Sequence, residues 1–474
     1  NVAEFSRAAA RALEKGVPMV ALKAGKSAGA RRAAMTHTGS LSGVDEAYEA
    51  LFERLAISRA RSPEMFMEQL KALSITGPLA GNRFAVMTCS GGEAALVSDY
   101  AETCGIELPQ PTPAQRETLR GVLPDFANIT NPLDYNTSIW GRRKALERAF
   151  TAMMRENCDG AMLVLDFLTG SEYGNEPDIA IDALIAASKA TGVSAMHACS
   201  LSESVTAAAQ GKMIANRIAP LQGLEHAVFA AGACVRYGAQ REANAGRDIT
   251  LPPVAAPPGN AAMLDEDASK RRLAAYGLVV PEGRVVDGGG AGAAAEDLGF
   301  PVVLKALDAG IAHKSEAGAV HLGLADGAAV TRAAAEMTGR LGVERFLVEA
   351  MIEDAVCELI VGVNHDPSLG QVLVIGSGGL LVEIIGDSRS ILLPTDRDTV
   401  ARTLDGLKAA APMAGYRGKP AGDRDAVIDA VLAVACFAEE HRGRLVELDV
   451  NPLIVRPRGR GAVAADALIR IADE

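Results

Sequence analysis

The feature that most constrains the fold is the alternation of short apolar runs with longer helical patterns between Arg83 and residue 237. The apolar runs are Phe84–Thr88, Ala161–Asp166, Val193–Ala198 and Arg217–Leu221, and the helical patterns lie near 142–156, 177–191, 203–211 and 224–236. Strands that alternate with helices predict a parallel sheet with helices on both faces. Sheets of this kind bind ligands at the carboxyl ends of their strands.

Two groups of residues are candidates for such a site. Ser90-Gly91-Gly92 directly follows the first apolar run and opens a helix, whose dipole and free N–H groups can hold an anion. Asp134 ends the polar loop that begins at Asn128, after a second strand position. A tight turn without a ligand explains the glycine pair equally well.

The first 76 residues predict a further, partial flavodoxin-like α/β unit. Helices are expected at the start of the chain, over about 44–55 and over about 63–73, and strands over 17–22 and near Ile57. Between the first strand and the second helix lies a loop over 23–43 that contains His37, with Lys23, Lys26, Arg31 and Arg32 upstream. Neutral imidazole is nucleophilic near pH 7 and can carry a transferred group. The alternative is a turn in which His37 is incidental.

A Pro-rich, Ala-rich stretch over 238–262 predicts an extended linker to the last part of the chain, 263–474. In that part, Lys305 ends an apolar run and a small-residue loop over 311–320 follows it. Asn451 and Asp466 come later, on expected neighbouring strands. A lysine can neutralise phosphate, and hard oxygen atoms suit Mg²⁺, so these are parts that could grip a nucleoside triphosphate. Each of them also has a purely structural explanation, and no Walker motif is present.

Length, net charge and cysteine content exclude some classes of protein. At 474 residues the chain is long enough for about three domains. A net charge of −12 argues against a nucleic-acid partner, and no apolar segment is long enough to cross a membrane. Seven scattered cysteines without metal-ligand spacing predict reduced thiols in the cytoplasm. Because the chain begins with Asn1, inside a helical pattern, we expect further sequence upstream.

Several motifs match one known family. The segment Ala34–Gly43 resembles the phosphohistidine loop of the NDP-forming acyl-CoA synthetases, relatives of succinyl-CoA synthetase. Pro301–Lys305, His313–Val320 and Glu447–Leu453 resemble the ATP-grasp module of the same family. The resemblance implies an α/β chain of flavodoxin-like units followed by an ATP-grasp α+β domain. Its domains would be 1–76 (with the phosphohistidine loop), 82–237 (the CoA-ligase unit), the linker 238–262, and 263–474 (ATP-grasp).

The resemblance also implies an activity and its residues. The enzyme would make acyl-CoA from a small carboxylic acid, CoA and ATP, releasing ADP and phosphate through acyl phosphate and phosphohistidine intermediates, with Mg²⁺ as cofactor. His37 and His313 would carry or relay the phosphoryl group, and Asn451 and Asp466 would bind the metal. The ATP-binding residues would be Lys305, Lys314, Ser315, Gly318, Glu349 and Glu358, and the phosphate or substrate loops would be formed by Thr38, Gly39, Ser90, Gly91, Gly92 and Asp134.

The sequence departs from the family pattern at one end. The family's amino-terminal CoA-binding domain is absent from these 474 residues. We therefore expect a homo-oligomer or a pairing with the missing CoA-binding portion. One alternative is a non-catalytic or regulatory subunit that binds CoA or a nucleotide. Another is an ATP-grasp ligase or lyase that forms a thioester intermediate.

Overall fold

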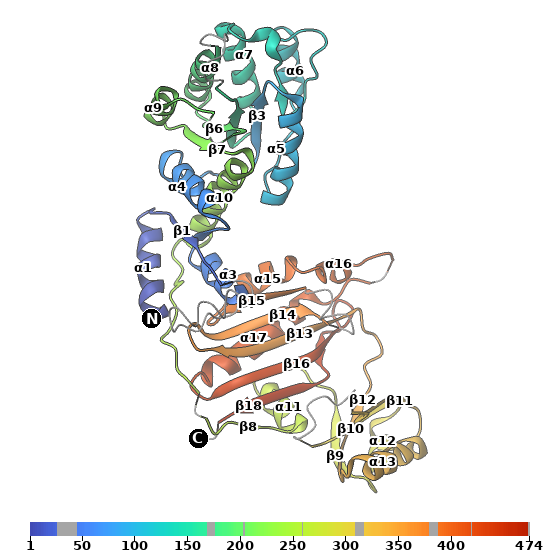
Figure 1. The fold of residues 1–474 in the computed structure, drawn as a ribbon. Helices are drawn as coiled ribbons and strands as arrows, with labels where there is room; N and C mark the ends of the chain where they lie inside the picture. Colours follow the sequence, from blue (N-terminus) through green and yellow to red (C-terminus); the bar gives the residue numbers. More distant parts are fainter. Residues whose placement is uncertain are drawn as a thin grey trace. The chain divides into compact units, whose positions relative to one another are not determined.

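The structure, a computed structural model, describes residues 1–25, 45–167, 176–201, 204–257, 259–308, 317–378, 387–418 and 420–472 (Figure 1). The chain forms two compact units. The first contains 5–26 and 52–250, and the second contains 1–4, 27–51 and 251–474.

The main sheet of the first unit is parallel throughout. Its strands are β3 (Phe84–Thr88), β4 (Leu133–Asp134), β5 (Gly160–Val164), β6 (Ser194–Cys199) and β7 (Ala219–Gln222), in the order β4-β3-β5-β6-β7. The first strand in the sequence thus lies between the second and the third. This is the flavodoxin-like order, so the predicted doubly wound unit is confirmed.

Helices cover both faces of this sheet (Figure 1). They are α5 (Gly91–Cys104), α6 (Pro113–Arg120), α7 (Arg143–Met154), α8 (Glu176–Thr191), α9 (Ala207–Ala215) and α10 (Leu224–Ala243). Because both faces are covered, the central strands are apolar along their whole length, and β3 and β5 are buried at every position. The sequence pattern missed α6, whose polar residues hide its period.

A two-stranded parallel sheet precedes the main one and consists of β1 (Met19–Leu22) and β2 (Ile57–Ala60). The helices of this part are α1 (Val2–Glu14), α3 (Asp45–Arg54) and α4 (Pro63–Ile75). Helix α4 begins where its sequence requires, because Ser62 accepts a hydrogen bond from the Met65 N–H and Pro63 occupies the first turn. All five elements lie where the sequence predicted them.

The predicted linker begins later than expected. Residues 238–243 are the last turns of α10, not extended chain. Gly238 suggested a break, but its lack of a side chain serves packing: a Cβ atom there would lie 2.1 Å from the Leu79 carbonyl oxygen. The backbone of Leu79 lies against the helix and donates a hydrogen bond to the Cys234 carbonyl (3.2 Å).

The second unit is built on two antiparallel sheets. The smaller has the order β11-β10-β12-β9, and its strands are β9 (Gly283–Asp287), β10 (Val302–Ala306), β11 (Val320–Leu324) and β12 (Arg345–Ala350). Helices α12 (Ala291–Leu298) and α13 (Gly327–Leu341) pack against each other and share its apolar core.

The larger sheet has the order β15-β14-β13-β16-β18-β8, with β17 paired to β16. Its strands are β8 (Ala262–Met263), β13 (Cys357–Asp366), β14 (Gly370–Ser377), β15 (Ser388–Leu392), β16 (Leu445–Val455), β17 (Ala462–Ala464) and β18 (Ala467–Ile471). Helices α11 (Glu266–Ala274), α15 (Arg397–Asp405), α16 (Ala410–Met413) and α17 (Arg424–Glu440) accompany it and help to form its core. Strands β12 and β13 follow each other in the sequence, but they belong to different sheets.

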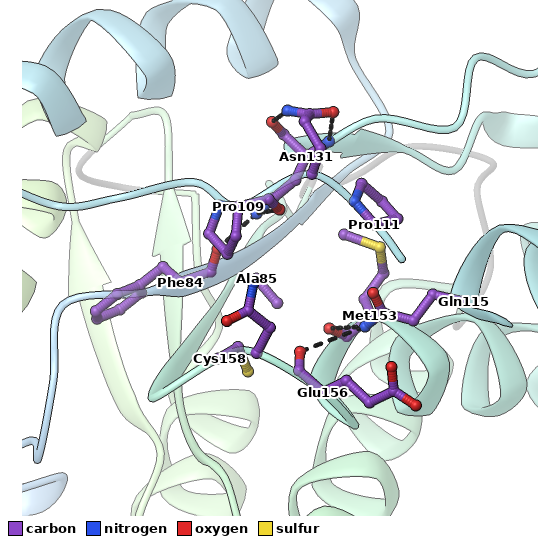
Figure 2. Close-up of a pocket in the computed structure, with 11 residues that line it drawn as sticks. Phe84, Ala85, Pro109, Pro111, Gln115, Asn131, Met153, Glu156 and Cys158 are labelled. Atoms are coloured by element: carbon purple, nitrogen blue, oxygen red, sulfur yellow. Dashed lines mark hydrogen bonds between the residues drawn. The ribbon is translucent and has the colours of Figure 1, made fainter. Parts of the chain in front are cut away.

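One predicted polar loop in the first unit has a structural role. Asn131 is buried, and its amide accepts a hydrogen bond from the Val86 N–H (3.0 Å) and donates to the carbonyls of Phe84 (2.6 Å) and Pro109 (3.0 Å). Figure 2 shows it above a cavity of only about 10 Å³ at the amino ends of β3 and β5. This is the end of the sheet opposite the expected ligand site.

We expect Asn131→Ala to lower the free energy of unfolding by about 2–4 kcal/mol, because it leaves buried backbone groups of Val86 and Phe84 without partners. Chemical denaturation measures the change, with the exposed Asn128→Ala as the matched control. A loss no larger than that of the control would contradict the structural role.

Candidate active site

The switch point of the flavodoxin-like sheet lies between β3 and β5. From β3 the chain first adds β4 on one side and then crosses to add β5 on the other side of β3. The polar residues at the carboxyl ends of the strands here are Ser90, Asp134 (the last residue of β4) and Asp166, with Ser200 after β6. The structure brings the predicted Gly91 and Asp134 together, since a Cβ atom at Gly91 would lie 3.6 Å from an Asp134 carboxylate oxygen.

Helix α5 begins at this crevice and is capped by the predicted motif. The Ser90 side chain accepts a hydrogen bond from the Glu93 N–H (3.4 Å), and the Ser90 N–H donates to the Thr88 hydroxyl (3.1 Å). A Cβ atom at Gly92 would have only the Ser90 hydroxyl nearby, at 3.7 Å. The two glycines are therefore not required by backbone conformation or crowding, and they leave the first turn of α5 open to approach.

The sequence did not single out Glu93 as a functional residue. Its carboxylate accepts hydrogen bonds from the hydroxyls of Thr88 (2.5 Å) and Ser200 (2.6 Å), while the Ser200 N–H donates to Asp166 (2.9 Å). The Ser-x-x-Glu spacing was the available signal, but it predicts only a capping box, in which the glutamate would bond to the Ser90 backbone.

Cys89 lies at the same edge and is not a nucleophile. Its burial, followed by the nearby charge of Glu93, raises the pKa of the thiol to about 11. The thiol is therefore protonated at neutral pH.

In the second unit, Lys305 lies in a buried ionic cluster that we call the lysine–glutamate quartet: Lys270, Lys305, Glu266 and Glu349. The Lys305 ammonium lies 2.6 Å from Glu266, 2.9 Å from Glu349 and 2.5 Å from the Ala465 carbonyl oxygen. Lys270 contacts the same three groups, at 2.8, 2.7 and 2.6 Å respectively. The four side chains are between 0 and 8% exposed.

The charges of the four side chains determine the pKa values of the two lysines. Burial lowers the pKa of Lys305, but the carboxylates of Glu266 and Glu349 outweigh burial and raise it above its ordinary value. Burial, followed by the neighbouring Lys305 cation, lowers the pKa of Lys270. Lys305 is thus a permanent cation. Glu349, predicted on the nucleotide side, is held between the two lysines.

Oxygen ligands lie beside the quartet. Asp466 directly follows Ala465, and its backbone oxygen accepts a hydrogen bond from the Asn451 N–H (3.2 Å). The Asn451 side chain is also hydrogen-bonded to Asp449, which the sequence did not select. Burial, followed by the charge of Asp466, raises the pKa of Asp449 to about 6.

This donor set fits a magnesium ion. No three His, Cys, Asp or Glu residues form a metal-binding group within the described part of the chain. Mg²⁺ does not need such a group, because it typically binds one or two carboxylates and keeps waters and phosphate oxygens as its other ligands. Two carboxylates and one amide satisfy that requirement.

Two further predicted residues lie elsewhere in this unit. Gly318 lies two residues before β11 and has a φ of +61°, a conformation that favours glycine, so its presence has a structural explanation. Glu358 lies on β13 and lines an open cleft of about 520 Å³ with Ser377 and Lys408. The other predicted site residues lie outside the described part of the chain: His37, Thr38, Gly39, His313, Lys314 and Ser315.

Comparison with known proteins gives the family. An ATP-grasp domain model matches residues 255–471, and a succinyl-CoA ligase like flavodoxin domain model matches 1–73. The β subunit of the ADP-forming acetate–CoA ligase II of Pyrococcus furiosus is 32% identical over 44% of this chain and 92% of its own length. The chain belongs to the family of ADP-forming acyl-CoA ligases. The predicted family and fold class are thus confirmed.

The ADP-forming acetate–CoA ligase I of Archaeoglobus fulgidus is 28% identical over 96% of this chain. This chain covers 66% of that relative, so it spans about two thirds of the length of a full ligase of the family. One similar solved structure is a chain of the dinucleotide forming acetyl-coenzyme A synthetase 1 of Candidatus Korarchaeum cryptofilum. The aligned region covers 44% of this chain and 94% of the solved chain, with 27% sequence identity and a TM-score of 0.42.

Two general expectations can also be compared with the structure. Among the described helices, none combines the length and the apolar character that crossing a membrane requires. All seven cysteines are described, and none forms a disulfide.

We expect Asp449→Asn to stabilise the chain above about pH 6 when divalent metal is chelated. The pKa of Asp449 is raised from 3.8 to about 6 on folding, so its charge opposes folding above pH 6 and has no effect once both states are protonated, below pH 4. Two pKa units correspond to at most about 3 kcal/mol.

Denaturation at pH 8 and pH 4 measures this difference, with Glu344→Gln, a change at an exposed glutamate of the same unit, as the control. Equal stabilities of wild type and Asp449→Asn at pH 8 would show that the charge of Asp449 does not oppose folding.

We expect Gly91→Ala and Gly92→Ala to leave stability within about 1 kcal/mol of wild type, because nothing lies closer than 3.6 Å to the added methyl groups. The same methyl groups obstruct the open turn, so the dissociation constant of inorganic phosphate should rise at least tenfold. Melting temperature and phosphate affinity, by calorimetry, are measured together. Unchanged affinity in both variants would exclude this turn from the site.

Proposed function

We propose that this chain carries the nucleotide site and the phosphohistidine loop of an acid–CoA ligase that releases ADP and phosphate. Its substrates are a small carboxylic acid, CoA and ATP with Mg²⁺. The observation that carries the proposal is the position of the Lys305 cation, which contacts the carbonyl of Ala465 directly beside Asp466 and its partners Asn451 and Asp449. A fixed cation beside hard oxygen ligands suits a magnesium-bound triphosphate.

The proposed reaction has three steps. His37 attacks the terminal phosphorus of ATP, and the bond to ADP breaks. The acid's carboxylate then takes the phosphoryl group from His37, which gives an acyl phosphate and free imidazole. Finally, the CoA thiolate attacks the acyl carbon and phosphate leaves, which gives the thioester.

The chain's residues position and neutralise charge in these steps. Lys305 binds phosphate oxygens, and Asn451, Asp466 and Asp449 hold the magnesium ion, which offsets charge on the phosphates. The open first turn of α5, with Ser90, Gly91 and Gly92, holds the anionic acyl phosphate or phosphoryl group through its N–H groups, beside Asp134. Glu349, Glu358, Gly318, Lys314 and Ser315 complete the nucleotide site, and His313 assists transfer to His37.

The domain boundaries and the partners belong to the same proposal. Residues 1–76, 82–237 and 263–474 act as the phosphohistidine, CoA-ligase and ATP-grasp parts. A Pyrococcus furiosus relative is named as a β subunit, which supports a ligase assembled from separate portions. We infer that this chain works with a CoA-binding portion, on the same polypeptide or on a partner subunit, in the cytoplasm, where its thiols stay reduced.

We expect labelled ATP to give acid-labile, base-stable protein phosphate in wild type and at least a hundredfold less in His37→Ala, because an imidazole phosphoramidate has this stability. His321→Ala, a described histidine outside the predicted set, is the control. Undiminished labelling of His37→Ala would contradict the assignment. ADP release that needs both acid and CoA separates a ligase from a regulatory nucleotide-binding subunit.

A further inference from the structure

Three oxygen groups surround the Lys305 ammonium. It donates hydrogen bonds to Glu266 (2.6 Å) and to the Ala465 carbonyl (2.5 Å), and it forms an ion pair with Glu349 at 2.9 Å. The side chain is 8% exposed, so water does not compete strongly for these positions. A phosphate oxygen that binds Lys305 therefore enters a position already crowded by these three groups, and its approach is favoured if one of them moves away.

Two of the acceptors are fixed where they are. The Ala465 carbonyl is part of the backbone between β17 and β18, and the Ala465 N–H is itself bonded to the Pro452 carbonyl (2.9 Å). Glu349 lies on β12 directly beside β10, in register with Val303, and Lys270 holds both of its oxygens at 2.7 and 2.9 Å.

Glu266 is held differently. It lies at the start of α11, a helix outside the sheet that carries Lys305, and a single oxygen contacts both Lys305 (2.6 Å) and Lys270 (2.8 Å). If Glu266 releases Lys305, Lys270 still neutralises it. The exchange therefore leaves no buried carboxylate without a counter-ion, which would be the costly outcome.

We propose that Glu266 and a nucleotide phosphate compete for the same N–H of Lys305, and that Lys270 retains Glu266 when the phosphate binds. Glu266 and Lys270 are then positioning residues that hold Lys305 ready and charged. This inference rests on the proposed nucleotide site. Lys305 stays a fully coordinated cation throughout, because one anionic oxygen replaces another.

The competition predicts opposite effects for the two positioning residues. Without the charge of Glu266, a neutral oxygen competes less strongly for the same Lys305 N–H, and phosphate should bind more tightly. Without Lys270, both glutamates depend on Lys305 alone and phosphate should bind more weakly. A purely structural role predicts the same direction for both, since each change disrupts the cluster.

The test measures the dissociation constant of a magnesium-bound, non-hydrolysable ATP analogue by calorimetry on the whole chain. We expect Glu266→Gln to lower it about three- to tenfold and Lys270→Met to raise it by a similar factor, the range for one partly screened charge. Asp267→Asn removes a charge from the same turn of α11 without touching Lys305, since Asp267 pairs with Arg271, and should change it less than twofold.

A double variant keeps the proposal testable if a single variant fails to fold. Glu266→Gln with Lys270→Met keeps the net charge of the cluster, and in that background Glu266→Gln should again tighten binding relative to Lys270→Met alone. Weaker or unchanged binding in both Glu266 comparisons overturns the competition. If wild type itself does not bind the analogue, the proposed nucleotide site fails instead, and the two failures are thereby distinguished.

Discussion

The buried pairing of two lysines with two glutamates is the constraint on which the second unit depends. Removing four charged groups from water is expensive, and each charge in the quartet is tolerated only because the others compensate it. The cluster joins three elements: α11, through Glu266 and Lys270, and strands β10 and β12, through Lys305 and Glu349. Because both ammonium groups also bind the Ala465 carbonyl, the cluster fixes the smaller sheet to the edge of the larger one, beside Asp466.

The flavodoxin-like unit depends on a different feature, the exposed first turn of helix α5. Its parallel sheet directs α5 away from the carboxyl end of β3, and small residues at 91 and 92 keep the first turn uncovered. Glu93 is anchored by two hydroxyls instead of returning to the Ser90 backbone. The acidic and hydroxyl groups at this edge thus form a fixed polar rim around the helix terminus.

Local pattern was sufficient for most elements and for a parallel sheet covered on both faces, because apolar runs that alternate with helical patterns encode them directly. The flavodoxin-like strand order was implied by the family resemblance and not by local pattern. Local pattern failed for residues whose role depends on a contact that is distant in the sequence. Gly238 was placed at the start of the linker because the carbonyl of Leu79, which requires a glycine there, is distant in the sequence. The polar loop that begins at Asn128 gave no sign that Asn131 would be buried and bonded to β3. Lys270 was missed for the same cause: 79 residues separate Lys270 from Glu349, and only folding brings them together.

The central claim is that the Lys305 cation binds the phosphates of a magnesium nucleotide. Its most direct test is the affinity of wild type and Lys305→Met for magnesium ADP, measured by calorimetry together with the melting temperature. The account predicts a dissociation constant at least tenfold higher in a variant that remains folded, because a buried cation at an anion site contributes more than about 1.4 kcal/mol. Equal affinity in a folded Lys305→Met protein would contradict it.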